Sequence, residues 1–133
     1  MTTTSVLVVG ASLGGLTVVE ALRREGFSGS VTLLGAERHL PYDRPPLSKR
    51  VLLSAMEPSQ TQLRPQSTLD QLHAELVLSD PAVCLDASRH EVKTASGRVL
   101  AADVIVLATG LVPRKLSGQD GLSGVYVLRT LDD

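Results

Sequence analysis

Residues 6–15 read Val-Leu-Val-Val-Gly-Ala-Ser-Leu-Gly-Gly, and this stretch decides the fold. The apolar run over 6–9 ends at a glycine, which is typical of a strand buried on both faces of a parallel sheet. Apolar residues at helical spacing predict a helix over 14–25, and Gly26 is its expected stop. A second strand is predicted over 31–34. This order of strand, glycine turn, helix and strand within about thirty residues is a βαβ unit.

The glycine turn has the spacing Gly10-x-Ser12-x-x-Gly15, which is the dinucleotide-binding fingerprint with serine in place of its middle glycine. In that fingerprint the first glycine allows a tight turn, the middle one lets the backbone approach a pyrophosphate, and the third lets helix and strand pack closely. The phosphates bind at the helix N-terminus, where N–H groups and the helix dipole favour anions. The Cβ of Ser12 intrudes on this approach, but its hydroxyl can donate to a phosphate oxygen. The candidate pyrophosphate contacts are Gly10, Ser12, Leu13, Gly14 and Gly15.

The same turn has two other interpretations. One is a glycine-rich turn that binds nothing. The other is the nucleophile elbow of α/β-hydrolases, because residues 10–14 also fit G-x-S-x-G with Ser12 as the nucleophile. An elbow needs earlier strands to build its sheet and oxyanion hole, and only nine residues precede Gly10. Three histidines follow Ser12, in a proline-rich loop, on a predicted helix and in a predicted hairpin turn: His39, His73 and His90. The serine hydrolase is therefore the remote alternative.

A carboxylate is expected near the end of the second strand of such a unit, where it accepts hydrogen bonds from a ribose. Only Glu37 can take this position, because it lies just beyond the strand predicted over 31–34 and the residues between are uncharged. The alternative is a solvated glutamate on the surface.

A proline-rich loop follows over residues 41–49, which read Pro-Tyr-Asp-Arg-Pro-Pro-Leu-Ser-Lys. Its prolines restrict the backbone and hold two cations, Arg44 and Lys49, at a set separation. Such a pair suits a pyrophosphate and an electron-rich ring, and the alternative is a pair of solvated charges around a proline turn. Pro46 can occupy the first turn of a helix predicted over 47–53.

Shorter elements are predicted in the second half of the chain. Residues 54–65 are expected to be irregular, and Ser67 to cap a short helix that runs to His73. Short strands separated by turn signals then predict a small antiparallel meander: 76–78, 82–85, 91–93 and 98–100. A buried strand of the parallel type follows over 103–108, and one further strand is expected over 125–128. One α/β domain accounts for the whole chain.

The buried strand over 103–108 ends in Ala108-Thr109-Gly110, and Arg114 follows shortly after. Small residues at a strand end permit close approach of the backbone to a cofactor, and the guanidinium adds an anion-pairing fork. An ordinary strand end would also fit this motif.

The bulk properties exclude several classes of protein. A net charge of −1 provides no basic field for nucleic acid, and no apolar run approaches the length needed to span a bilayer. The N-terminus lacks the positive segment and apolar core of a signal peptide, so the protein is expected to be cytoplasmic. No His or Cys pair has metal-ligand spacing, and we expect no metal site.

The three motifs together resemble the flavin-binding half of the NADH-dependent ferredoxin reductases, the group that includes putidaredoxin, rubredoxin and dioxygenase-component reductases. The resemblance covers essentially the whole chain and implies an incomplete Rossmann-like FAD/NAD(P)-binding domain over residues 1–133, without the nicotinamide and C-terminal domains of the group. It implies FAD as cofactor, NAD(P)H as electron donor in the full-length relative, and an iron–sulfur ferredoxin or similar carrier as partner. The alternative is a catalytically inactive nucleotide-binding fragment.

The resemblance also implies roles for particular residues, none of them an acid–base catalyst. Arg44 would lie near the phosphate side of the adenosine and Lys49 near the isoalloxazine ring, while the backbone at Val83 would meet the adenine edge. In many relatives the ribose acid falls one residue before the position of Glu37. The ADP part of the cofactor would be contacted by Ala108, Thr109, Gly110 and Arg114.

Disulfide reductases of the same architecture have a redox cysteine pair near the proline-rich loop, whereas this chain has no cysteine before Cys84. The resemblance therefore implies that electrons leave the flavin one at a time to an external carrier. Cys84, between Val83 and Leu85, is expected to be a small buried hydrophobe.

Overall fold

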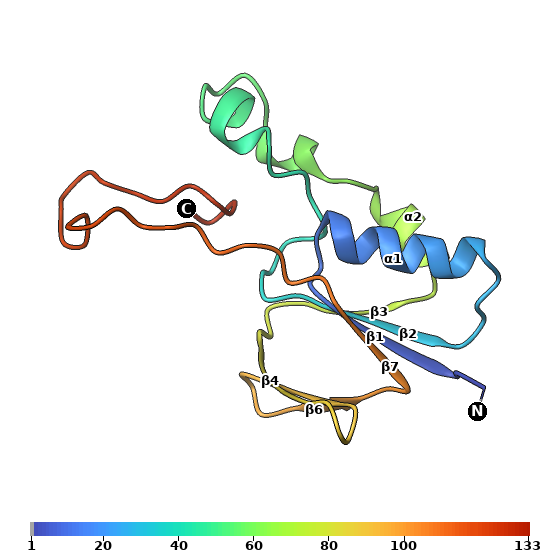
Figure 1. Ribbon diagram of the computed structural model, residues 1–133. Helices are drawn as coiled ribbons and strands as arrows, with labels where there is room; N and C mark the ends of the chain where they lie inside the picture. Colours follow the sequence, from blue (N-terminus) through green and yellow to red (C-terminus); the bar gives the residue numbers. More distant parts are fainter. Residues whose placement is uncertain (1) are drawn as a thin grey trace. The chain divides into compact units, whose positions relative to one another are not determined.

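The computed structural model describes residues 2–133, which divide into two compact units (Figure 1). The first unit comprises the chain up to Tyr42 together with Leu63–Gly110. The second comprises Asp43–Gln62 and Leu111–Asp133.

A four-stranded parallel sheet forms the centre of the first unit. Its strands are β1 (Ser5–Val9), β2 (Ser30–Leu34), β3 (Glu75–Val77) and β7 (Val104–Leu107), in the spatial order β3-β2-β1-β7. The two central strands are the runs rich in Val and Leu from which the sheet was predicted, which confirms the α/β fold class. One part of the prediction was wrong: the segment expected over 76–78 belongs to this parallel sheet and not to the meander, because it pairs with β2.

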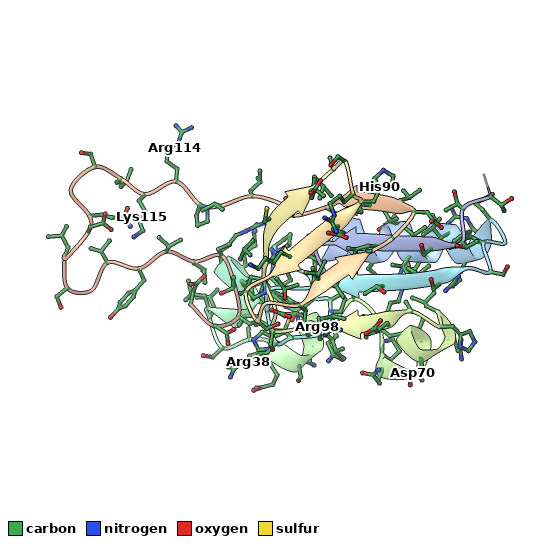
Figure 2. The ribbon with its side chains drawn as sticks, turned by 90° about the horizontal axis from the view of Figure 1, so that it is seen from below. Arg38, Asp70, His90, Arg98, Arg114 and Lys115 are labelled. Atoms are coloured by element: carbon green, nitrogen blue, oxygen red, sulfur yellow. The ribbon has the colours of Figure 1, made fainter. Side chains whose placement is uncertain are left out.

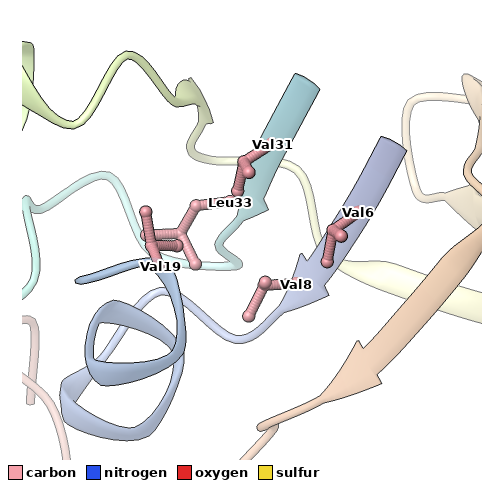
Figure 3. Close-up of a cluster of buried hydrophobic side chains, with 5 residues drawn as sticks. All are labelled: Val6, Val8, Val19, Val31 and Leu33. Atoms are coloured by element: carbon pink, nitrogen blue, oxygen red, sulfur yellow. The ribbon is translucent and has the colours of Figure 1, made fainter. Parts of the chain in front are cut away.

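Helix α1 (Leu13–Arg24) covers one face of the parallel sheet. Val6 and Val8 of β1 face this helix, and Val19 of the helix is completely buried against them. Figure 3 shows this cluster, in which two side chains of β2 complete the contact: Val31 and Leu33. Alternate residues of a strand point to opposite faces, so the other side chains of β1 need a second layer.

A small antiparallel sheet supplies that second layer (Figure 1). Its strands are β4 (Ala82–Asp86), β5 (Glu91–Thr94) and β6 (Val99–Ala101), in that order, as the meander prediction required. Val92 of the middle strand is buried against Leu7 and Val9 of β1. In Figure 2, His90 and Arg98 mark the turns at the two opposite ends of β5.

Helix α1 ends as its sequence predicts. Gly26 has left-handed backbone (φ 83°), its N–H bonds to the Arg23 carbonyl at 3.1 Å, and the N–H of Phe27 bonds to the Leu22 carbonyl at 2.9 Å. This pair of bonds is the Schellman motif, in which a glycine takes the conformation that other residues adopt only at a cost.

Helix α2 (Gln66–Gln71) is shorter than the helix predicted through His73, and the predicted cap was wrong. The residue that precedes the helix is Pro65, whose extended backbone directs the chain into the first turn, so Ser67 lies inside the helix. His73 has left-handed backbone (φ 47°) beyond the helix end. The guanidinium of Arg23 holds this end, since it donates to the carbonyls of Leu72 (2.7 Å) and His73 (2.9 Å).

The second unit has little regular structure. The helix predicted over 47–53 forms as the single π-type turn η1 (Leu47–Val51), and a 3₁₀ turn η2 (Pro58–Thr61) follows. The prediction of a strand over 125–128 was wrong, because these residues pair with no strand and Tyr126 is 82% exposed. Among residues 2–133, no helix has both the length and the apolar character that a membrane crossing demands.

Candidate functional site

Three chain segments meet at one edge of the parallel sheet. Gly10 follows β1, Glu37 lies three residues beyond β2, and Ala108 follows β7, so all are at the carboxyl ends of parallel strands, where ligands bind in open α/β sheets. The N–H of Gly10 donates to the Leu34 carbonyl and the N–H of Ala108 to the Val9 carbonyl, each at 2.7 Å. These bonds extend the sheet by one residue and fix the start of each loop.

Two glycines of the turn are required by packing, and a third is not. Gly10 has φ 118°, and a Cβ on it would lie 2.1 Å from the carbonyl oxygen of Ala108. A Cβ on Gly15 would lie 1.9 Å from the carbonyl oxygen of Gly10. By contrast, a Cβ on Gly14 would meet only the Cβ of Ala108, at an ordinary 3.7 Å. The close approach of α1 to β1 therefore depends on Gly15.

The N-terminus of α1 has no carboxylate in its first turn. Ser12 precedes the helix with extended backbone (φ −132°), and its side chain makes no capping hydrogen bond. A nucleophile elbow holds its serine in a strained turn, so this ordinary backbone does not favour the hydrolase alternative. The first amides of a helix lack partners within the helix, and here none of the residues in the first turn is acidic, so none of them would repel an anion.

The side chain of Glu37 is held by a tyrosine that the sequence analysis did not single out. The hydroxyl of Tyr42 donates to the Glu37 carboxylate, and Tyr42 itself is 97% buried, with the ring of His39 edge-on at 6.0 Å. The backbone of Glu37 is also fixed, since its carbonyl accepts the N–H of Ser79 at 3.0 Å. This carboxylate therefore has a defined position at the sheet edge, and the Pro-Tyr-Asp start of the loop was the signal that could have identified Tyr42.

Gly35 is a second residue that the sequence analysis passed over. It is buried, and a Cβ on it would lie 2.7 Å from the Cβ of Ala11 and 2.9 Å from a methyl carbon of Leu78. The glycine turn thus packs directly on the end of β2, and a side chain at position 35 would displace Ala11 from it.

Val83 lies at an irregularity in β4. Ala82 pairs with Thr94 and Cys84 with Lys93, so the register shifts and Val83 has no partner residue in the ladder. Its side chain is 60% exposed. A residue displaced from a ladder in this way directs its backbone groups elsewhere, which is what recognition of a base edge by the backbone would need.

The prediction that Cys84 is buried was wrong, because its side chain is exposed. Every residue of β4 is exposed, since β4 is an edge strand of the small sheet, whereas β5 and β6 place Val92 and Leu100 against the parallel sheet. Cys84 shares the outer face of this sheet with its cross-strand partner Lys93.

In the second unit, the two cations of the proline-rich loop line one pocket of about 350 Å³. Arg44 donates to the Arg129 carbonyl at 2.9 Å, and Lys49 donates to the Pro45 carbonyl at 3.3 Å. The pocket also includes Leu128 and Arg129, which the sequence analysis did not select. A third cation thus borders the space between the first two.

The carboxylate of Asp133 organises the turn that carries Arg129. It accepts the N–H groups of Thr130 (2.6 Å) and Arg129 (2.7 Å), and these bonds, with a smaller contribution from the charge of Arg44, lower the pKa of Asp133 below its usual value. This turn positions the carbonyl that Arg44 contacts.

The strand-end motif is divided between the two units. Ala108 packs beside the glycine turn, whereas Thr109 and Gly110 are exposed, and Gly110 has left-handed backbone (φ 74°). Arg114 belongs to the second unit and is exposed on its extended segment (Figure 2).

The residues of the first unit fit a dinucleotide. An anion can approach the start of α1, a carboxylate is held beyond the end of β2, and the register shift leaves Val83 without a partner residue in its ladder. No metal is needed for such binding, and among residues 2–133 no group of three metal-ligating side chains gathers.

Comparison with known proteins gave consistent matches. The family model described as pyridine nucleotide-disulphide oxidoreductase matches residues 4–133. The chain is 40% identical over 129 residues to the ferredoxin–NAD(+) reductase component of the p-cumate 2,3-dioxygenase system of Pseudomonas putida, which covers 96% of this chain and 32% of the relative. The chain spans about a third of the length of the curated relatives it matches first.

Solved structures agree with these matches. The crystal structure of the ferredoxin reductase for the CYP199A2 system from Rhodopseudomonas palustris superimposes with a TM-score of 0.88 at 38% identity, covering 97% of this chain and 32% of that chain. The covalent putidaredoxin reductase–putidaredoxin complex gives a TM-score of 0.82 at 31% identity, covering 89% and 28%.

Proposed function

The chain belongs to the pyridine nucleotide-disulphide oxidoreductase family, and from this membership we propose that it forms the FAD-binding portion of an NAD(P)H-dependent ferredoxin reductase. In the full-length protein, electrons would pass from NAD(P)H through FAD to an iron–sulfur ferredoxin or similar carrier. The names of the relatives support this proposal, since they are ferredoxin reductases of dioxygenase and putidaredoxin systems. We propose that residues 1–133 are the N-terminal portion of one FAD-binding domain.

The observation that carries the proposal is the close packing of the glycine turn. Gly15 lets α1 approach β1 so closely that a single Cβ would overlap the Gly10 carbonyl, while the start of the helix bears no acidic residue. The first helical amides are thereby directed over the end of β1, where a pyrophosphate would accept their hydrogen bonds. Ser12 would add a hydroxyl donor, since its side chain is not used for capping.

The remaining residues would contact different parts of the cofactor. Glu37, fixed by Tyr42, would accept hydrogen bonds from the ribose of the adenosine, and the backbone at Val83 would meet the adenine edge. Bound FAD would accept a hydride from the nicotinamide and release electrons singly to the carrier. In the second unit, Arg44 would pair with a phosphate and Lys49 would place a positive charge beside the flavin ring.

The pocket of the second unit contains three cations and no carboxylate among its lining residues. A positive environment stabilises the negative charge that accompanies phosphate groups and a reduced ring. We therefore propose that Arg129 joins Arg44 and Lys49 in this role, in addition to offering its carbonyl to Arg44.

Turnover measurements test the proposal. Residues 1–133 and the full-length protein would each be mixed with FAD, NADH and ferricyanide, and loss of the nicotinamide absorbance would be followed. We expect turnover from the full-length protein and none from residues 1–133 alone, because hydride transfer requires a positioned donor. Turnover by residues 1–133 at about one per second or faster would contradict the proposed partial site. A full-length protein that binds the nucleotide but does not turn over would favour the inactive nucleotide-binding alternative.

A further inference from the structure

Asp80 is a buried carboxylate at the junction of the two sheets of the first unit, and the roles proposed above do not use it. It is 92% buried, and both of its oxygens are engaged by one residue of the turn between β5 and β6. Oδ1 accepts the backbone N–H of Ser96 at 3.0 Å, and Oδ2 accepts its hydroxyl at 2.7 Å. The Ser96 hydroxyl in turn lies 3.1 Å from that of Thr94, which is also buried.

The backbone around Asp80 continues this connection to the end of β2. The N–H of Asp80 donates to the Gly35 carbonyl at 3.1 Å, and the N–H of Ser79 donates to the Glu37 carbonyl at 3.0 Å. Ser79 adopts left-handed backbone (φ 61°), which a residue with a side chain keeps only where its surroundings hold it. Three residues after Asp80, the chain reaches the irregularity at Val83.

Asp80 therefore joins the two segments that carry the proposed adenosine contacts. On one side its backbone fixes the loop that ends at Glu37, and on the other its carboxylate fixes the hairpin turn next to the start of β4. A second bond supports that start, since the N–H of Ala95 donates to the Pro81 carbonyl at 2.8 Å. Glu37 follows a strand of the parallel sheet and Val83 belongs to the antiparallel sheet, so their separation depends on this junction.

We propose that Asp80 is a positioning residue that sets the distance between the ribose contact at Glu37 and the adenine contact at Val83. This inference rests on the proposed function. The carboxylate itself would not touch the nucleotide, because Ser96 occupies both of its oxygens. Hydrogen bonds from Ser96 and Thr94, with a smaller contribution from the charge of Arg98, lower the pKa of Asp80, so the group is ionised at neutral pH and accepts these bonds at full strength.

The chain contains a matched control for this carboxylate. Asp86 also caps a hairpin turn of the small sheet, since it accepts the N–H and hydroxyl of Ser88 and the N–H of Arg89. Its turn lies at the opposite end of β5 (Figure 2, at His90), and its carboxylate has no bond to the Gly35–Glu37 segment. Loss of Asp86 therefore removes a turn cap of the same chemistry without affecting the junction.

The experiment measures the affinity of the full chain for two probes by calorimetry. ADP would contact Glu37, Val83 and the glycine turn, whereas inorganic pyrophosphate would contact only the turn. We expect Asp80→Ala to weaken ADP binding by about fivefold to tenfold, roughly the value of one net hydrogen bond, and to leave pyrophosphate affinity unchanged. Asp80→Asn keeps acceptor and donor atoms toward Ser96 and should restore ADP affinity to within about twofold.

The outcomes separate this inference from the proposed function. Failure of the unchanged chain to bind ADP would overturn the proposed function and this assignment with it. If the unchanged chain binds ADP, equal affinity in Asp80→Ala, or an equal loss in Asp86→Ala, would overturn the positioning role alone. A loss of ADP and pyrophosphate affinity together would indicate a general structural effect and would also overturn it. Should Asp80→Ala fail to fold, Ser96→Ala can be measured instead, because it removes one of the two bonds to the carboxylate. Unchanged ADP affinity in Ser96→Ala would likewise overturn the positioning role.

Discussion

Substitution of Gly15 by alanine is the perturbation whose effect follows most directly from the structure. The new Cβ would lie 1.9 Å from the Gly10 carbonyl oxygen and 3.0 Å from a methyl carbon of Leu33, whereas ordinary van der Waals contact begins at 3.4 Å. Helix α1 must therefore move away from β1 by about 1.5 Å. Overpacking of this kind costs about 1–3 kcal/mol of folding free energy.

The same displacement affects the ligand. A hydrogen bond from the first helical turn to a phosphate is lost when its length grows from about 2.9 Å by more than half an ångström. One hydrogen bond to a charged group contributes about 1.5–3 kcal/mol, so the Kd for ADP should rise at least about tenfold. Gly14→Ala is the matched control, because alanine keeps the backbone N–H through which Gly14 would contact a pyrophosphate, its Cβ would make only an ordinary 3.7 Å contact, and alanine favours the helix.

Calorimetric titration of ADP into both variants checks this expectation. Circular dichroism at the titration temperature establishes that each variant is folded, so that a higher Kd reflects a change in the binding site and not a loss of the fold. Gly14→Ala should bind as the unchanged chain does. Equal ADP affinity in Gly15→Ala and Gly14→Ala would refute the idea that close packing of α1 creates a pyrophosphate site.

Three further predictions concern charge and stability. In a full-length protein that binds FAD as proposed, Lys49→Met should lower the flavin reduction potential by on the order of tens of millivolts, because the reduced ring would lose a nearby positive charge, whereas Arg50→Met should not. A spectroelectrochemical titration with equal shifts in both variants would disprove the assignment. Hydrogen bonds from Thr4 and Ser5 lower the pKa of Asp103 to about 2, so its carboxylate stabilises the fold above its ordinary pKa near 3.8 and that contribution disappears as the pH falls toward 2. Asp103→Asn should therefore have a lower melting temperature than the unchanged chain at pH 7, and the difference between the two should narrow between pH 4 and pH 2. A difference that does not depend on pH would contradict the stabilising role of the ionised carboxylate. Arg23→Ala should lower the free energy of unfolding, measured in urea, by about 2–4 kcal/mol, because four backbone carbonyls lose their donor. Arg24→Ala, whose ion pair is exposed, should lower it by at most about 0.5 kcal/mol. Similar losses in the two variants would show that the carbonyl contacts do not matter.

The sequence was sufficient to predict the elements that depend on local signals. The run over 6–9 is buried on both faces, as its uninterrupted apolar residues predict, and Gly26 ends α1 by a motif that spans only a few residues. Turn-forming residues between the short strands also revealed the turns of the small sheet. These features depend on periodicity and on the conformational freedom of glycine, which are both visible in the residue order.

Features that depend on tertiary packing could not be predicted from the sequence. Cys84 has the apolar neighbours of a buried strand, yet its strand lies at an edge and is exposed. Strand β3 looks like a meander strand until its pairing with β2 is known. Likewise, Tyr42 and Asp80 support the candidate site through side-chain hydrogen bonds that no spacing predicts, from Tyr42 to Glu37 and from Ser96 to Asp80.

The claim that this chain carries the FAD-binding portion of a reductase is tested most directly by equilibrium binding of FAD. Purified residues 1–133 would be titrated with FAD while the flavin fluorescence is followed, and ADP would then be added as a competitor. We expect one FAD for each chain, and ADP should displace it because both occupy the glycine turn. FAD that does not bind at millimolar concentration, or that binds but is not displaced by ADP, would contradict the assignment of the glycine turn as the pyrophosphate site.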